Sequence, residues 1–286
     1  MFIIEIIKTV LIGIIQGITE WLPISSTGHM ILFNAAWPLE VRVEFWEMFS
    51  VVIQLGSILA VVVLYFSKLN PFSPKKSSSE KKSTWSLWVK VLIGSIPAAI
   101  VGLLINDWLD TMLYEGEGEL TVRTLGAIII AVALIVYGIA FILIEKFKKS
   151  KDKYETTDEV SYKTALGIGA FQMLALIPGT SRSGSTIIGS RLLGVSRSAA
   201  AEFSFFLAIP VMAGASLLKA VKLFVEGFTM TGAEWAYLAV GCAVSFLVSL
   251  VTIKFLTGFV KNHTFIPFGI YRIILGAAVI VWMIFR

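Results

Sequence analysis

Long apolar segments separated by short polar ones dominate the pattern along this chain. Six of them are about 20 residues long and nearly free of charge, the length at which a helix crosses the hydrocarbon core of a membrane. They cover residues 46–66, 85–105, 122–144, 199–222, 236–257 and 265–285. The short alternating segments of a transmembrane barrel are missing. The pattern therefore predicts an all-α polytopic membrane protein.

Two shorter apolar segments, 2–19 and 162–177, each run into a turn rich in Pro, Gly, Ser and Thr. The charges of the loops predict on which side of the membrane each end of these segments lies. Loops 67–84 and 145–163 are rich in lysine, which predicts that both lie in the cytoplasm. The loop between them, 106–120, is predicted to lie outside and carries only acidic charge, at Asp107, Asp110, Glu115, Glu117 and Glu119.

The number of crossings restricts how the two shorter segments are arranged. One crossing, 199–222, already joins the cytoplasmic loop 145–163 to loop 223–235, which has no Lys or Arg and is predicted to lie outside. Residues 162–198 must therefore enter and leave on the cytoplasmic side as a re-entrant hairpin. Residues 2–37 form either a hairpin from the outer face or a pair of crossings, and their lengths favour the hairpin. Irregular backbone at membrane depth must be buried by protein or line a wet cavity, so both polar turns are predicted to line a cavity.

The two hairpins also resemble each other in sequence. Pro23-Ile24-Ser25-Ser26 matches Pro178-Gly179-Thr180-Ser181 at an offset of 155, and Glu47 matches Glu202 at the same offset. Three crossings separate the copies, so the repeat must be inverted, with the hairpin tips meeting near the midplane. The predicted fold is therefore six transmembrane helices plus two re-entrant helical hairpins in an inverted-topology repeat. It forms a single membrane domain, 1–286, with halves of approximately 1–120 and 160–286 linked by 121–159.

Composition narrows the class further. Of the 286 residues, 57% are hydrophobic and only 15% are charged, which fits a membrane protein rather than a soluble domain. The net charge of +5 does not indicate nucleic-acid binding, because the lysines cluster in two loops. The single Cys242 excludes a disulfide within the chain. Glu5 and Lys8 interrupt the first apolar segment, so it is not expected to be a cleavable signal.

The second polar turn, PGTSRSGST at 178–186, has the groups of an anion site. Arg182 brings a permanent positive charge and can bind phosphate through two parallel hydrogen bonds. Gly179 and Gly184 let the backbone approach closely, and a helix after the turn would point its first N–H groups at the cavity. Alternatively, Arg182 snorkels to the cytoplasmic face and the small residues serve helix packing. The hydroxyls of this turn belong to Thr180, Ser181, Ser183, Ser185 and Thr186.

The first polar turn lies in QGITEWLPISSTGHM, residues 16–30. Gln16 and Glu20 are four residues apart and share a helix face. Glu20 could orient a base or hold a divalent cation, with Gln16 as a neutral supporting ligand. If a helix follows the turn, Ser26 and His29 also share a face and form a minimal nucleophile–base pair. The remaining hydroxyls with a predicted substrate-binding role are Thr27 and Ser25, although Ser25 could instead only cap a helix.

Together these groups predict a buried phosphate site in which a hydroxyl, an imidazole and a carboxylate face an arginine. Arg272, inside the last crossing, could add positive charge. This layout suits phosphoryl transfer, where positioning and charge neutralisation supply most of the rate. A cavity among apolar helices indicates a lipid substrate, so the residues predict a lipid-phosphate hydrolase. The alternative is a secondary transporter or lipid flippase, which an inverted repeat with a midplane site also fits.

Five motifs in the chain resemble one known family. They are QGITEWLPISSTGHM, VVIQLGSILAVV, PGTSRSGST, AAEFSFFLAIP and FIPFGIYR, and they extend over essentially the whole chain. They closely resemble the bacterial undecaprenyl-diphosphate phosphatases of the bacitracin-resistance type. The resemblance implies a multi-pass enzyme of the bacterial cytoplasmic (inner) membrane that hydrolyses undecaprenyl diphosphate to the monophosphate. It also implies recycling of the lipid carrier for cell-wall synthesis, bacitracin resistance, and a site that opens to the outer (periplasmic) face.

The resemblance also implies where the family's site residues lie in this chain. The family's E/Q-xxx-E motif falls on Gln16 and Glu20, its serine pair and histidine on Ser25, Ser26 and His29, and its PGxSRSxxT motif on Pro178 to Thr186. A divalent cation, Mg²⁺ or Ca²⁺, is implied. Because the first position here is Gln16, a mechanism that needs two carboxylates on one metal is disfavoured.

The expected mechanism combines both turns. Arg182, Ser181, Ser183 and Thr186 grip the diphosphate, and a cation near Glu20 neutralises charge on the bridging oxygen. His29 acts as general base for Ser26 or for a water. A phosphoserine, a phosphohistidine and direct water attack all stay open. So does the oligomeric state, including a homodimer. The expected partners are the lipid substrate and membrane lipids.

Overall fold

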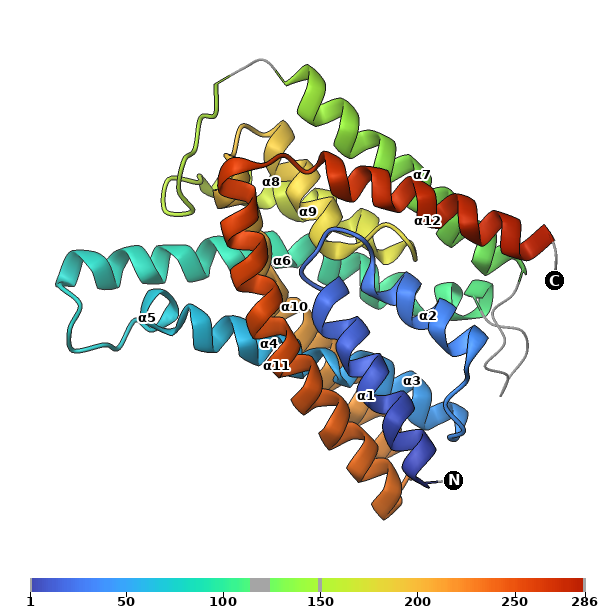
Figure 1. Cartoon of the computed structure of the whole chain (residues 1–286). Helices are drawn as coiled ribbons and strands as arrows, with labels where there is room; N and C mark the ends of the chain where they lie inside the picture. Colours follow the sequence, from blue (N-terminus) through green and yellow to red (C-terminus); the bar gives the residue numbers. More distant parts are fainter. Residues whose placement is uncertain (1, 114–123, 149–150, 285–286) are drawn as a thin grey trace.

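The computed structural model describes residues 2–113, 124–148 and 151–284, with side chains described except at 106–124. Within these ranges the chain is helical, and extended pairing is limited to one bridge between Tyr154 and Val195. The helices shown in Figure 1 are α1 (Phe2–Thr19), α2 (Ser26–Ala36), α3 (Val43–Val52), α4 (Gln54–Leu64), α5 (Phe66–Leu69), α6 (Ser78–Leu113), α7 (Thr124–Phe147), α8 (Tyr162–Gln172), a 3-10 turn (Met173–Leu176), α9 (Arg182–Leu192), α10 (Arg197–Val225), α11 (Gly232–Asn262) and α12 (Ile266–Ile284).

Seven helical segments of the described chain are long and apolar enough to cross a membrane. Six correspond to the predicted crossings, namely α3 with α4, α6, α7, α10, α11 and α12. The seventh is α1, which the sequence assigned to a hairpin. The predicted all-helical class is confirmed. Helix α6 continues to Leu113, so the predicted acidic loop 106–120 starts as helix, and its five acidic side chains lie outside the described residues.

The first predicted crossing is two helices rather than one. Helix α3 ends at Val52 and α4 begins at Gln54, with Ile53 between them. The carbonyl groups near this break find partners on neighbouring helices. Ser216 Oγ donates to Val51 O at 3.1 Å, and Cys242 Sγ contacts Val52 O at 3.7 Å. Such neighbours are what make a broken helix tolerable at membrane depth.

Helices α1 and α2 form one hairpin, and α8 and α9 form the other, each around a polar turn. Ser25 and Ser181 are the two non-glycine residues with positive φ in the described chain, at 76° and 73°. Each caps the helix that follows, because its hydroxyl accepts from the backbone N–H of Gly28 or Gly184. The two turns therefore correspond at Ser25 and Ser181. The sequence alignment had paired Ser26 with Ser181, one residue out of step, because the second turn has one more residue after its proline.

Close helix packing fixes both hairpins to the rest of the molecule. Helix α1 lies along α11, and α8 lies along α6 (Figure 1). These pairs approach so closely that a Cβ on Gly17 would lie 2.9 Å from Ser245 O, and one on Gly169 would lie 2.2 Å from Gly94 O. Small residues of this kind let membrane helices approach backbone to backbone.

Two ion pairs tie α10 to the first half of the chain. Glu47 on α3 accepts from Lys219 near the end of α10 at 2.7 Å. Glu202 near the start of α10 pairs with Lys68 on α5. The two glutamates that the sequence matched at an offset of 155 thus make matching contacts at opposite ends of α10.

Candidate active site

The two polar turns meet. Arg182 Nη2, at the start of α9, donates to Glu20 Oε1, just after α1, at 2.9 Å. Nearby, Ser183 Oγ donates to Leu22 O at 3.3 Å. A charged pair from residues 162 positions apart is thereby held inside the protein, and both side chains are mostly buried. The predicted convergence of the two turns is therefore present in the fold.

Glu20 is the centre of a hydrogen-bond network. Its Oε2 accepts from Gln16 Nε2 at 3.0 Å and from Ser26 Oγ at 2.7 Å. The first contact confirms that Gln16 and Glu20 share a helix face. Three donors, one of them cationic, surround a carboxylate that is only 5% exposed. Together these donors hold the orientation of the Glu20 side chain.

The other terminal nitrogen of Arg182 donates a hydrogen bond to α10. Its Nη1 donates to Ser204 O at 2.7 Å, and its guanidinium lies 5.6 Å from the ring centre of Trp21. Arg182 Nε is buried without a hydrogen-bond partner in the described chain. The guanidinium is therefore held in place on two sides while Nε is left without a partner, which does not fit the alternative in which Arg182 snorkels to the surface.

Four of the five hydroxyls of the second turn divide into two groups, and the fifth, Ser185, donates to the Tyr137 hydroxyl at 3.3 Å. Ser181 and Ser183 contact each other at 3.1 Å beside Arg182. Thr180 and Thr186 instead serve the turn itself. Thr180 Oγ1 donates to Ile177 O at 2.6 Å, and Thr186 Oγ1 contacts Ser204 Oγ at 2.7 Å. The serine hydroxyls are engaged as well, because Ser183 Oγ donates to Leu22 O and Ser181 Oγ accepts from the Gly184 N–H. In the first turn, Thr27 is exposed beside Ser26.

His29 does not pair with Ser26. Its Nδ1 lies 2.7 Å from Ser25 O, and its Nε2 lies 2.7 Å from the Tyr271 hydroxyl on α12. Because a carbonyl only accepts, this network assigns the proton of the neutral ring to Nδ1 and leaves the basic lone pair at Nε2. Ser26 bonds to Glu20 instead. The predicted Ser26–His29 contact is therefore not formed in this conformation, because Ser25 O and the Tyr271 hydroxyl are the partners of the two ring nitrogens.

Two residues with direct contacts to the site were missed in the sequence. Tyr271 and Ser204 lie in FIPFGIYR and AAEFSFFLAIP, each as a polar group in an apolar stretch. That isolation is the signal that could have found them, although nothing in the sequence identifies their partners.

Arg272 binds both turns together. It is fully buried, donates through Nη1 to Pro23 O at 3.1 Å and through Nη2 to Gly179 O at 2.7 Å. The guanidinium also lies 5.4 Å from the ring centre of Tyr137. Instead of being directed at a bound anion, its two terminal nitrogens hold the backbone of the two turns at a fixed separation. Gly179 has a φ of 93°, a conformation that favours glycine there.

Replacing Arg272 by methionine is therefore expected to destabilise the protein by about 3 kcal/mol, because two buried carbonyls lose charged donors. A thermal melt of the purified protein in detergent measures the effect. The matched control is Ile274→Ala, at an exposed position of the same helix, which should change the melting temperature little. Equal melting temperatures for Arg272→Met and wild type would contradict the role of Arg272 in joining the turns.

The oxygen atoms of Glu20 and Gln16 can be compared with the ligands that a divalent cation needs. Gln16 Oε1 is buried and has no hydrogen-bond partner within the described residues. No cluster of three or more His, Cys, Asp or Glu suited to a metal occurs in the described chain. Mg²⁺, however, is commonly held by one or two carboxylates together with substrate phosphates. The Glu20 carboxylate and Gln16 Oε1 therefore fit the oxygen-ligand chemistry of such a cation.

Comparison with known proteins identifies the family. A model of the family described as "Bacitracin resistance protein BacA" matches residues 9–278. A protein of Enterococcus faecalis named "Undecaprenyl-diphosphatase" is 53% identical over 279 residues, which cover 97% of both chains. "Undecaprenyl-diphosphatase 1" of Clostridioides difficile is 52% identical over 98% of this chain and 97% of its own. The motifs, the helical fold and these matches agree, and the chain belongs to the BacA family of bacitracin resistance proteins.

Proposed function

We propose that this protein hydrolyses undecaprenyl diphosphate to undecaprenyl phosphate and inorganic phosphate. The relatives' names supply the substrate, and the contact between Glu20 and Arg182 is the observation that best supports the location of the reaction. In this reaction the terminal phosphorus gains a bond to an attacking oxygen, and its bond to the bridging oxygen breaks. Undecaprenyl phosphate is the leaving group. The activity would recycle the lipid carrier and underlie bacitracin resistance.

Arg182 is proposed to bind the diphosphate. A bidentate guanidinium suits phosphate oxygens, and the unused Nε adds a donor on the same plane. Ser181 and Ser183 lie beside it, at the N-terminus of α9, where backbone N–H groups favour an anion. Glu20 keeps the guanidinium oriented until the substrate arrives. The diphosphate then exchanges for Glu20 at Nη2, which frees a carboxylate oxygen.

Two groups could accept the proton from the nucleophile. Glu20 Oε2 already accepts from Ser26 Oγ at 2.7 Å, so Ser26 as nucleophile would give its proton to Glu20. His29 Nε2 would act on a water after Tyr271 gives way. Phosphate trapped from labelled substrate separates these routes, because phosphoserine survives acid and phosphohistidine does not. Direct water attack leaves no trapped label.

A divalent cation, Mg²⁺ or Ca²⁺, is proposed to be held by Glu20 and Gln16. When bound, it would neutralise charge on the diphosphate oxygens. The residues of the chain would still provide orientation and proton transfer: Gln16 fixes Glu20 through its amide, and Glu20 fixes Ser26.

The membrane arrangement is also proposed. Six crossings with two re-entrant hairpins form one domain, built as an inverted repeat whose site opens to the outer face of the cytoplasmic membrane. The matched caps at Ser25 and Ser181, and the matched packing of α1 on α11 and α8 on α6, support the repeat. The predicted halves were 1–120 and 160–286. The segment 121–159 that links these halves contains α7, which packs along α12 (Figure 1).

The function is tested by phosphate release from undecaprenyl diphosphate with purified protein in detergent. We expect turnover that a chelator abolishes and Mg²⁺ or Ca²⁺ restores. The alternative of a lipid flippase or transporter draws support from the broken pair α3 and α4 and from Pro210 inside α10. Lipid movement across vesicles without phosphate release would favour that alternative and contradict hydrolysis.

A further inference from the structure

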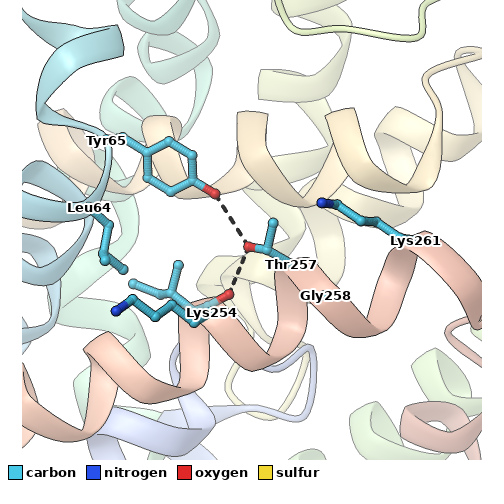
Figure 2. Close-up of a pocket in the computed structure, with 7 residues that line it drawn as sticks. Leu64, Tyr65, Lys254, Thr257, Gly258 and Lys261 are labelled. Atoms are coloured by element: carbon cyan, nitrogen blue, oxygen red, sulfur yellow. Dashed lines mark hydrogen bonds between the residues drawn. The ribbon is translucent and has the colours of Figure 1, made fainter.

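A cleft that contains no residue of the two polar turns lies between the C-terminal ends of α4 and α11. Its volume is about 310 Å³, and it is open to the surface. Figure 2 shows its lining. The residues are Leu64, Tyr65, Ile253, Lys254, Thr257, Gly258 and Lys261.

Two lysines give the cleft a positive charge. Lys254 and Lys261 lie on α11 on either side of Thr257 and Gly258 (Figure 2), and both are exposed. Neither forms an ion pair in the part of the chain that the structure describes, whereas Lys68 and Lys219 do. Seven residues of helix separate them by about 10 Å along the axis, and their flexible side chains can converge on one anion.

The backbone between the lysines is open. A Cβ on Gly258 would meet no atom within 4 Å, so the helix surface there is bare. Thr257 Oγ1 donates to Ile253 O at 2.7 Å, and the Tyr65 hydroxyl lies 3.3 Å from Thr257 Oγ1. With the threonine proton used on α11, the tyrosine donates to Thr257. This bond joins Tyr65, the residue after α4, to α11 within the lining of the cleft.

The surroundings of the cleft are those of a lipid site. Large apolar side chains beside it are more than half exposed, namely Val63, Phe66, Val251 and Phe255. In the predicted topology both α4 and α11 end on the cytoplasmic side, where anionic lipids attract basic residues. Cationic groups at the polar end of an apolar surface fit a headgroup phosphate with acyl chains lying along the helices.

We propose that the cleft between α4 and α11 is a binding site for an anionic phospholipid of the cytoplasmic leaflet. Lys254 and Lys261 bind the headgroup phosphate, and bare Gly258 makes room for it. This site is separate from the one formed by the polar turns and does not depend on hydrolysis.

Native mass spectrometry of the full chain, released from detergent with added phosphatidylglycerol or phosphatidylcholine, tests the proposal. We expect the wild type to retain phosphatidylglycerol preferentially. Replacing both lysines, Lys254→Gln with Lys261→Gln, should weaken retention by about 30-fold, on the basis of the usual contribution of a lysine at an anionic surface. Gly258→Leu should weaken it with both charges kept, and the open space at Gly258 makes misfolding of this variant unexpected.

The control is Lys75→Gln with Lys82→Gln, which removes the same charge from exposed positions in the lysine-rich loop 67–84, predicted to lie on the same side. It should bind like wild type. Retention unchanged in Gly258→Leu or in the Lys254 and Lys261 variant would overturn the proposal. So would equal loss in the control, which would indicate diffuse attraction. Competition by inorganic phosphate alone at similar affinity would identify a free-anion site and reject the lipid.

Discussion

Arg182→Lys is expected to lower kcat/KM for undecaprenyl diphosphate by about 100-fold or more. Arginine reaches Glu20, Ser204 and Trp21 at once because its planar fork has several fixed donors. An ammonium is a point charge that can keep one of these contacts but cannot bind two phosphate oxygens in parallel. The measurement is phosphate release by purified variant and wild type at matched protein concentration.

The matched control is Arg197→Lys, at the start of α10. Arg197 pairs with Glu145 and is about a third exposed, so a lysine can replace its charge there. That variant should keep near-normal turnover and melting temperature. If Arg182→Lys also turned over substrate at the wild-type rate, Arg182 would lose its proposed part in binding the diphosphate.

His29→Ala is expected to reduce kcat by about 10²- to 10⁴-fold, the usual contribution of a general base. The structure gives the reason. Ser25 O accepts from Nδ1–H, so the lone pair of Nε2 points toward Tyr271. The loss should appear in kcat more than in KM, because His29 makes no contact with Arg182 or Glu20 among the hydrogen bonds of this network.

The variant Tyr271→Phe tests how much the tyrosine hydroxyl contributes to activity apart from the His29 imidazole. It removes one hydrogen bond to Nε2 and keeps the ring that stacks on the imidazole. A loss of no more than about tenfold is expected, as for one ordinary hydrogen bond. A loss as large as that of His29→Ala would mean that the tyrosine hydroxyl carries the proton transfer. A fully active His29→Ala would leave Glu20 as the base acting on Ser26.

Many of the candidate residues could be found from the sequence because charge at membrane depth is costly. Glu20, His29 and Arg182 stand out against apolar segments, and such residues persist only when partners or function retain them. The six crossings could be found for the related reason that only long apolar helices satisfy their backbone in lipid.

The partners of these residues were harder to predict. Ser26 and His29 share a helix face, but their hydrogen bonds are decided by Glu20, Ser25 and Tyr271. From the sequence, Arg272 was expected to add positive charge near a bound anion. In the structure its guanidinium donates to the carbonyls of Pro23 and Gly179 instead. Sequence spacing gives proximity along one helix and says nothing about a group brought in by another.

The sequence by itself determined that this chain is an all-helical membrane protein with two polar turns rich in phosphate-binding groups. Apolar length and isolated charges are local properties, so they can be read along the chain. Only the tertiary structure decided that the turns meet through Glu20 and Arg182, that Arg272 holds them together, and that Ser25 and Ser181 are the equivalent caps. Those features depend on which helices pack against each other, and packing is a property of distant segments acting together.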